Sequence, residues 1–171
     1  MKFYEATIDI VFDVYEEDKD VEFKKEYNTF SQTNDDVVGQ WLRNAKARGE
    51  TKDSDMVLLT LLVELHRKVD TLTKIVNNEI KKRLELSFST TICGINFDGF
   101  EIEEALFEKD KTYYCRVALP VFPQRDIAIF VKAISNNGAK ISLMHESDEK
   151  DWNGYVRARE RAMIRELKAK A

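Results

Sequence analysis

The chain has 171 residues, of which 27 are Lys or Arg and 31 are Asp or Glu, so its formal net charge is −4. Hydrophobic residues make up 43% and charged residues 34%, a composition that supports a folded core and excludes a wholly disordered chain. The slight negative charge argues against generic nucleic-acid binding, although it leaves room for a local basic patch.

The first thirty residues are acidic, with nine carboxylates against four lysines. Within them, residues 6–14 are rich in β-formers, and Ile8, Ile10 and Phe12 alternate with other side chains. This period of two is typical of a strand. We therefore expect residues 1–30 to form an acidic arm or an edge strand.

A helix is predicted next, from Asn34 to about residue 48. Asn and Asp are favoured at helix starts, and Val37, Val38 and Trp41 then lie on one side of the predicted helix. Gly49 is expected to end it.

Residues 53–82 carry the clearest periodicity in the chain. No glycine or proline occurs between Gly49 and Gly94, so one helix of about 30 residues, about 45 Å long, is allowed. Asp53 or Ser54 is expected to cap its start. Its apolar residues are spaced by 4, 3, 4, 3 and 4, with leucine at each d position of a heptad and leucine or valine at each a position. These residues are Leu58, Leu62, Leu65, Val69, Leu72 and Val76.

The flanks of this heptad seam are also apolar, at Leu59, Leu61, Ile75 and Ile80. Such a stripe is too wide for a two-stranded coiled coil and suits a bundle. Either the helix over residues 34–48 covers it within one chain, or several copies share it. We predict a helical oligomerisation region over residues 31–83, with homo-oligomers formed through residues 53–82.

The period changes after Leu84, and residues 84–171 are predicted to form a separate domain. Strands are expected over residues 84–93, 112–119, 126–134 and 139–144, with Asn136-Asn137-Gly138 as a hairpin turn. A helix from Ser147 to about Leu167 follows, with Trp152 and Tyr155 packing on the strands. The predicted fold class is α+β: a helical hairpin with a long heptad helix, then a small antiparallel β-barrel closed by a C-terminal helix.

The residues that commonly carry chemistry are sparse. His66 and His145 have no metal-ligand partner at a useful spacing, and there is no zinc-type cysteine pair, glycine-rich phosphate loop or nucleophile elbow. Cys93 and Cys115 are expected to be reduced, buried thiols. We predict no metal, no cofactor and no enzymatic activity.

The most apolar stretch, residues 56–63, is too short to cross a bilayer, so we expect a cytoplasmic protein without membrane insertion.

Arginines are frequent in the last predicted helix, at Arg157, Arg159, Arg161 and Arg165. We expect an exposed helix face balanced by Glu160 and Glu166. The alternative is a site for an anion or an acidic partner.

The order of elements from residue 84 to 168 resembles a PilZ domain, the bacterial module whose members typically bind cyclic di-GMP. The residues that carry the resemblance are a strand entering a glycine turn over 91–100, a strand running into proline over 113–120, and the arginines near the middle of the last helix. The resemblance implies a barrel that binds the nucleotide through R-x-x-x-R ahead of its first strand and [D/N]-x-S-x-x-G on the barrel.

This sequence departs from both family motifs. The second motif falls on residues 94–99, where Gly99 matches, but Gly94 replaces the acidic or amide residue and Asn96 replaces the serine. The arginine motif is missing, and Lys81-Lys82-Arg83 has the wrong spacing.

We therefore expect a non-enzymatic adaptor or regulatory protein of bacterial cyclic di-GMP or motility signalling, which acts on protein partners, does not bind the nucleotide in the usual way and does not bind nucleic acid. One alternative is a cyclic di-GMP receptor with a non-standard site, and the other is a purely structural scaffold. The residues of the non-standard site would be Arg83, Asn96, Gly99 and Arg116.

Overall fold

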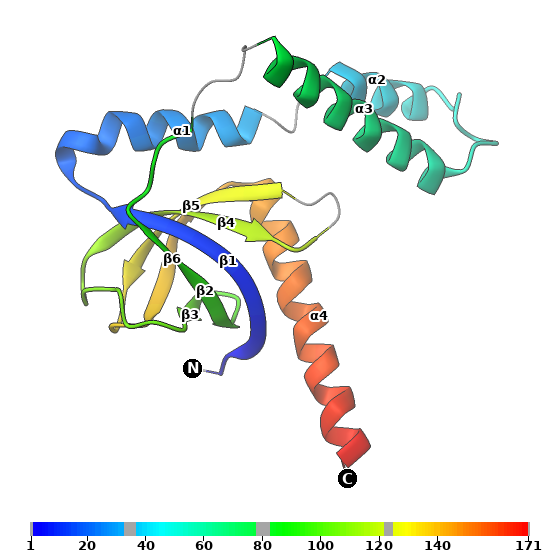
Figure 1. The fold of residues 1–171 in the computed structure, drawn as a ribbon. Helices are drawn as coiled ribbons and strands as arrows, with labels where there is room; N and C mark the ends of the chain where they lie inside the picture. Colours follow the sequence, from blue (N-terminus) through cyan, green and yellow to red (C-terminus); the bar gives the residue numbers. More distant parts are fainter. Residues whose placement is uncertain (1, 33–36, 78–82, 122–124, 171) are drawn as a thin grey trace. The chain divides into compact units, whose positions relative to one another are not determined.

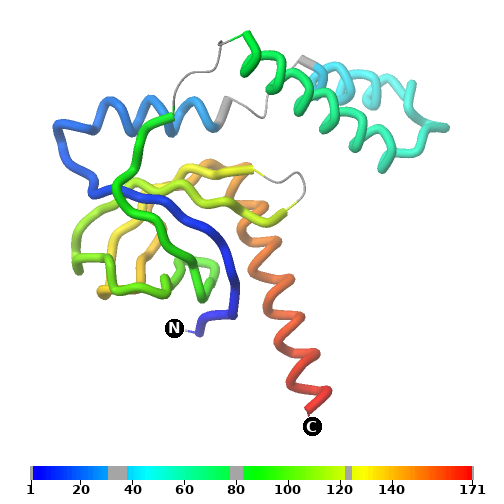
Figure 2. The backbone as a smooth tube through the Cα atoms, in the orientation of Figure 1, coloured from blue at the N-terminus to red at the C-terminus, as the bar shows by residue number. Residues whose placement is uncertain are grey.

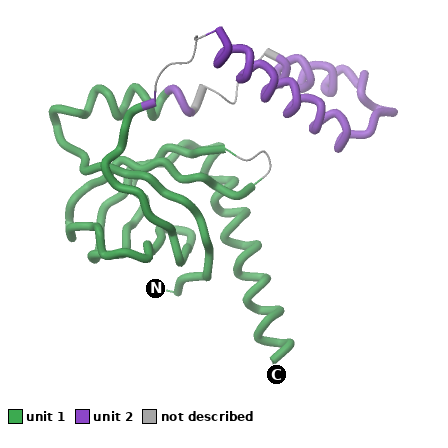
Figure 3. Tube along the Cα trace, in the orientation of Figure 1, with its two compact units in different colours: residues 1–28, 84–171 green, residues 29–83 purple. Residues whose placement is uncertain are grey.

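The structure is a computed structural model, and it describes residues 2–32, 37–77, 83–121 and 125–170. The chain forms two compact units (Figure 3). One comprises Met1–Asn28 and Leu84–Ala171, and the other comprises Thr29–Arg83. Residues 1–28 therefore belong with the barrel and do not form a segment of their own.

The first unit contains a closed barrel of six antiparallel strands, in the order β1-β2-β3-β6-β5-β4 (Figure 1). The strands are β1 (Tyr4–Val14), β2 (Phe88–Ile95), β3 (Gly99–Ile102), β4 (Thr112–Leu119), β5 (Arg125–Ala133) and β6 (Gly138–Met144). The helices are η1 (Glu17–Lys19, a 3-10 turn), α1 (Asp20–Gln32), α2 (Val37–Ala47), α3 (Met56–Val76) and α4 (Glu146–Lys170). This architecture confirms the predicted α+β class, the antiparallel barrel and the C-terminal helix.

Strand β1 corrects the expectation for residues 1–30. Buried side chains alternate along it with a period of two, from Tyr4 through Ile8 to Phe12, as in a strand with one face on a core. It pairs on both sides, so that Phe12 lies opposite Phe88 of β2 and Cys115 of β4. These residues form neither an arm nor an edge strand. The short alternating pattern indicates the strand, but the number of its partners depends on residues far along the chain.

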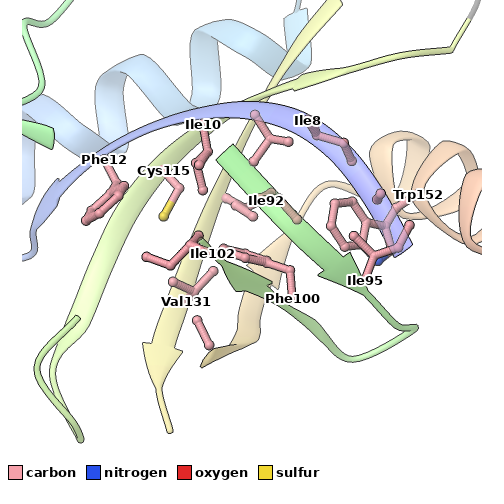
Figure 4. Close-up of a cluster of buried hydrophobic side chains, with 14 of the residues drawn as sticks. Ile8, Ile10, Phe12, Ile92, Ile95, Phe100, Ile102, Cys115, Val131 and Trp152 are labelled. Carbon is pink, nitrogen blue, oxygen red and sulfur yellow. The ribbon is translucent and has the colours of Figure 1, made fainter. Parts of the chain in front are cut away.

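The barrel interior is a packed apolar core (Figure 4). The Phe12 ring lies 5.3 Å from the Phe88 ring and 4.9 Å from the Phe107 ring, measured between centroids. Burying each such side chain contributes roughly 1.5–3 kcal/mol to folding. Other members of this cluster, drawn in Figure 4, are Ile8, Ile10, Ile92, Ile95, Phe100, Ile102, Cys115, Val131 and Trp152.

Helix α1 is absent from the sequence prediction, and it creates a second, aromatic core on the outside of the barrel. Phe23 stacks on Tyr114 of β4 at 4.9 Å, and Tyr27 lies 5.4 Å from Phe130 of β5. Phe23 and Tyr27 are four residues apart and therefore share one helix face. This cover explains why β5 is buried on both of its faces.

Helix α4 packs on the barrel as far as Met163 and extends past the strands at its C-terminal end (Figures 1 and 2). Trp152 is fully buried, and its indole Nε1 donates to the Asn96 carbonyl oxygen at 3.0 Å. The Tyr4 hydroxyl donates to Glu160 Oε1 at 2.6 Å, and Arg159 Nε donates to the Glu5 carbonyl oxygen at 2.6 Å. These contacts join the helix to the β2–β3 turn and to the start of β1.

The second unit contains α2 and α3. Gly49 follows α2 with a φ of +76°, a left-handed conformation that suits glycine and ends the helix as predicted. The cap of α3 is Asp55 instead of Asp53 or Ser54, and its carboxylate accepts from the Val57 and Leu58 amides. The predicted helix ends over 34–36 and 78–82 lie outside the described residues.

Among the described residues, no helix combines the length and the apolar character that crossing a lipid bilayer requires.

Candidate functional site

The apolar face of α3 is the most prominent surface feature of the helical unit. Six side chains at the predicted a and d positions, which we call the α3 seam, are between 51% and 79% exposed. They are Leu58, Leu62, Leu65, Val69, Leu72 and Val76. Large exposed apolar patches are typical of interaction surfaces, so the α3 seam is the candidate functional surface.

The opposite side of α3 is the side that the chain itself covers. Met56 and Val63 are half-buried, and Glu64 is buried and paired with Arg67 one turn further on. At 100° per residue, these positions lie across the helix from the α3 seam. The less exposed side of α3 is therefore the side opposite the seam.

Helix α2 does not cover the α3 seam. Gly39 and Ala45 of α2 are buried and Leu42 is half-buried, whereas Trp41 is 58% exposed. The sequence left two arrangements open: cover of the seam by the helix predicted over residues 34–48, or sharing of the seam between copies of the chain. The exposure of the seam argues against the first.

Two chains joined only through the α3 seam would be held together by a marginal free energy. Covering a half-exposed Leu or Val contributes about 1 kcal/mol, so six from each of two copies contribute about 12 kcal/mol. Association costs about 4–15 kcal/mol, which makes a contact through the α3 seam alone marginal. Leu61 and Ile75 flank the seam at g positions and are 50% and 51% exposed. A bundle that covered these two flanks as well would gain further stabilisation.

Asn96 and Gly99 shape the turn between β2 and β3. The Asn96 side-chain oxygen accepts from the Asp98 amide at 2.9 Å, and its backbone amide donates to the Gly99 carbonyl. A Cβ on Gly99 would lie 2.1 Å from the Ala139 carbonyl oxygen. The glycine is thus required by a close backbone approach and not by the positive φ that a glycine turn usually implies.

A groove of about 300 Å³ lies beside this turn. Phe97 and Trp152 line it, together with the carboxylates of Asp98 and Glu149. Among the described residues that line it, none is basic. This lining is unfavourable for a doubly anionic nucleotide, which requires guanidinium or ammonium partners.

Arg116 is engaged in a partly buried cluster on the outer face of β4. Its guanidinium lies 2.9 Å from Glu26 Oε1 of α1 and donates to the Leu84 carbonyl at 2.8 Å. Glu26 also accepts from the Tyr114 hydroxyl at 2.9 Å and from the Leu84 amide at 2.8 Å. Burial and the nearby Glu26 carboxylate raise the pKa of Tyr114. This Glu26 cluster joins α1, β4 and the chain at residue 84.

The Glu26 cluster was not predicted from the sequence, although the position of Glu26 next to two aromatic residues indicates part of it. Glu26 is three residues after Phe23 and one before Tyr27, so a helix over residues 20–32 places it beside the aromatic face. Its partner Arg116 is 90 residues away, and no local pattern connects the two.

Replacing Glu26 with glutamine should lower the free energy of unfolding of the barrel unit by about 3 kcal/mol, because Arg116 keeps its charge in a largely buried place without a counter-ion. Denaturant unfolding followed by Trp152 fluorescence, in a Trp41→Phe background, measures this. Glu108→Gln is the matched control, since its ion pair with Lys111 is exposed and should change stability by less than about 0.5 kcal/mol. Equal effects of the two substitutions would contradict the role assigned to Glu26.

Arg83, the fourth residue of the alternative nucleotide site, lies in the helical unit, where its guanidinium is 5.3 Å from the centre of the Phe30 ring. Arg116 of β4 pairs in register with Val11 of β1 and Ala128 of β5, whereas Asn96 lies in the turn between β2 and β3 and Gly99 begins β3. The structure therefore engages these residues in separate contacts, each of which holds part of the fold.

Several other titratable groups of the barrel unit also have structural partners. His145 stacks on Tyr27 at 3.8 Å, with Nε2 2.9 Å from the Tyr27 carbonyl oxygen. Burial raises the pKa of Asp148, against the opposing effect of Arg125, which lies 2.8 Å away. Burial also raises the pKa of the free thiol of Cys115.

Within the described ranges, no group of three or more His, Cys, Asp or Glu side chains is arranged to hold a metal ion. No protein-family model matches the chain, and no curated protein or solved structure matches it significantly.

Proposed function

We propose that this chain is a non-enzymatic, PilZ-like adaptor or regulatory protein that self-associates through the α3 seam and acts through protein contacts. The pathway, bacterial cyclic di-GMP or motility signalling, rests on the resemblance of residues 84–168 alone. An antiparallel barrel followed by a C-terminal helix is the arrangement that this resemblance implies.

The single observation that carries the proposal is the exposure of the α3 seam. Its six side chains repeat at the 3,4 spacing that allows knobs-into-holes packing between helices. A second copy of the chain presents the same spacing and the same width, which makes another α3 the best-matched occupant.

The barrel supports a binding role more than a catalytic one. Its interior is filled with apolar side chains, and the ionisable groups around it, among them Glu26, His145 and Asp148, form contacts that hold helices to strands. General acid–base chemistry requires such groups to face a substrate.

The nucleotide is not expected to bind in the manner of the family. The turn that carries the second motif borders a groove with two carboxylates, and Arg116 is neutralised by Glu26. Isothermal calorimetry with cyclic di-GMP should show no one-site isotherm in the micromolar range or tighter. Such an isotherm would favour the receptor alternative instead.

Light scattering after size exclusion, with and without cyclic di-GMP, tests the self-association. We expect a mass that is a multiple of the 19.9 kDa chain and that does not change when the nucleotide is added. A single-chain mass at micromolar concentration would overturn the proposal.

A further inference from the structure

The exposed side of the last helix carries a row of unpaired cations, which we call the α4 cationic stripe. Its members are spaced by 4, 4 and 3 residues and therefore share one face over about 16 Å of helix. They are Arg157, Arg161, Arg165 and Lys168. All four are exposed, and no hydrogen bond or ion pair joins any of them to another residue of the described chain.

The acidic residues of this helix segment do not neutralise the stripe. Glu160 accepts the hydroxyl proton of Tyr4 on β1, and Glu166 lines a groove with Phe3 at the start of the chain. Both therefore lie on the side of α4 that faces β1. Arg159 and Lys170 line the same groove as Glu166, so that side of α4 carries both signs of charge, whereas the stripe itself carries cations and no acidic residue.

The like charges of the stripe lower the stability of the helix, whereas a solvent-exposed face with mixed charges would not. Like charges four residues apart destabilise a helix, and Arg157, Arg161 and Arg165 form two such pairs. The helix dipole favours cations in the last turn, which accounts for Lys168 but not for the arginines a turn or more earlier.

We propose that the α4 cationic stripe is a docking surface for an acidic segment of a protein partner. The proposal deepens, and rests on, the proposed function of an adaptor that acts through protein contacts. Three of the four cations are arginines, whose planar guanidinium groups bind carboxylates in a bidentate manner. Ile164 lies within the row and is 45% exposed, which provides an apolar contact for a side chain between the partner's carboxylates.

The surroundings favour a short acidic segment over an extended polyanion. The segment from Arg157 to Lys170 has six basic and two acidic side chains, whereas the whole chain has a net charge of −4. A nucleic acid or an anionic membrane extends beyond the stripe and meets the repulsion of the acidic remainder. A membrane-surface helix also requires a broad apolar face, and on the stripe only Ile164 is apolar.

The test uses the full-length protein and a fluorescein-labelled synthetic helical peptide, with glutamates spaced by 4, 4 and 3 residues and one leucine between them. In fluorescence anisotropy at 50 mM NaCl we expect saturable binding, weakened at least tenfold at 300 mM NaCl. The double variant Arg161→Gln/Arg165→Gln should bind at least tenfold more weakly. The control Lys109→Gln/Lys140→Gln removes the same charge from exposed positions on the barrel unit and should change affinity less than twofold.

Two further arms identify the class of partner. Ile164→Ser should weaken peptide binding severalfold but leave the binding of a leucine-free peptide unchanged. Single-stranded DNA of twelve nucleotides and vesicles with 30% phosphatidylglycerol should bind more weakly than the peptide. Tighter binding of either one, no binding of the peptide, or equal losses in the stripe and control variants would overturn the proposal.

Light scattering separates this inference from the self-association on which the adaptor role rests. The stripe variant should keep the wild-type mass, because the α3 seam is unchanged. If the wild type is a single chain and still binds the peptide through the stripe, the self-association is refuted and the docking surface is supported. If the wild type is an oligomer and does not bind the peptide, the self-association is supported and the docking surface is refuted.

Discussion

Leu65→Asp is expected to give single chains in light scattering at concentrations where the proposed self-association gives the wild type a larger mass. Leu65 lies at the centre of the α3 seam, so in an assembly the new carboxylate is buried without a partner. Such burial costs several kcal/mol, and each 1.4 kcal/mol weakens association about tenfold.

The isolated chain should tolerate this substitution, because Leu65 is 58% exposed in it. Helical content by circular dichroism should stay within a few per cent of the wild-type value at low protein concentration. Thr71→Asp is the matched control: it introduces the same charge on α3, at an exposed position across the helix from the seam, and should retain the wild-type mass. Dissociation by both variants would point to a general charge effect and would refute the seam.

Gly99→Val is expected to produce the largest loss of folding stability. A Cβ at this position meets the Ala139 carbonyl oxygen at 2.1 Å and the Lys140 Cα at 3.1 Å. Because β3 pairs with β6 at this point, the backbones must separate and lose ladder hydrogen bonds. We expect a loss of at least about 3 kcal/mol, at the upper end of overpacking effects, measured as a lower denaturation midpoint by Trp152 fluorescence.

Gly154→Ala provides the control for a glycine with free space. It lies within α4, and nothing is within 4 Å of the added Cβ. Since alanine is favoured over glycine in helix interiors by up to about 1 kcal/mol, this variant should be slightly more stable than the wild type. A Gly99→Val protein that melts at the wild-type temperature would show that the β3–β6 approach is looser than described.

The barrel strands that follow residue 84 were largely accessible to sequence reasoning because their signals are local. The alternating run predicted over residues 112–119 is strand β4 (Thr112–Leu119), and the Asn136–Gly138 turn joins β5 to β6. In each case the period of two and the turn residues lie within a few positions of each other.

The elements that sequence reasoning missed depend on distant partners. Helix α1 has its apolar residues four apart, at Phe23 and Tyr27, but charged residues surround them and hide the amphipathic pattern. The face that these two residues cover, on β4 and β5, is about a hundred residues away. Pattern alone also cannot show which face of a helix its own chain covers, so the exposure of the α3 seam required the structure.

The two positions at which the chain crosses between its units are close together in space. The Leu84 amide donates to the carboxylate of Glu26, and β1 and β2, which precede and follow the helical unit, pair side by side. The helical unit is thus an insertion between β1 and β2, and the two barrel-unit segments that flank it meet at the Glu26 carboxylate. Domains tolerate insertions at such closely spaced ends. An insertion at this point can therefore change in length or sequence without changing the register of the strands, so the barrel and the helical unit are free to evolve independently.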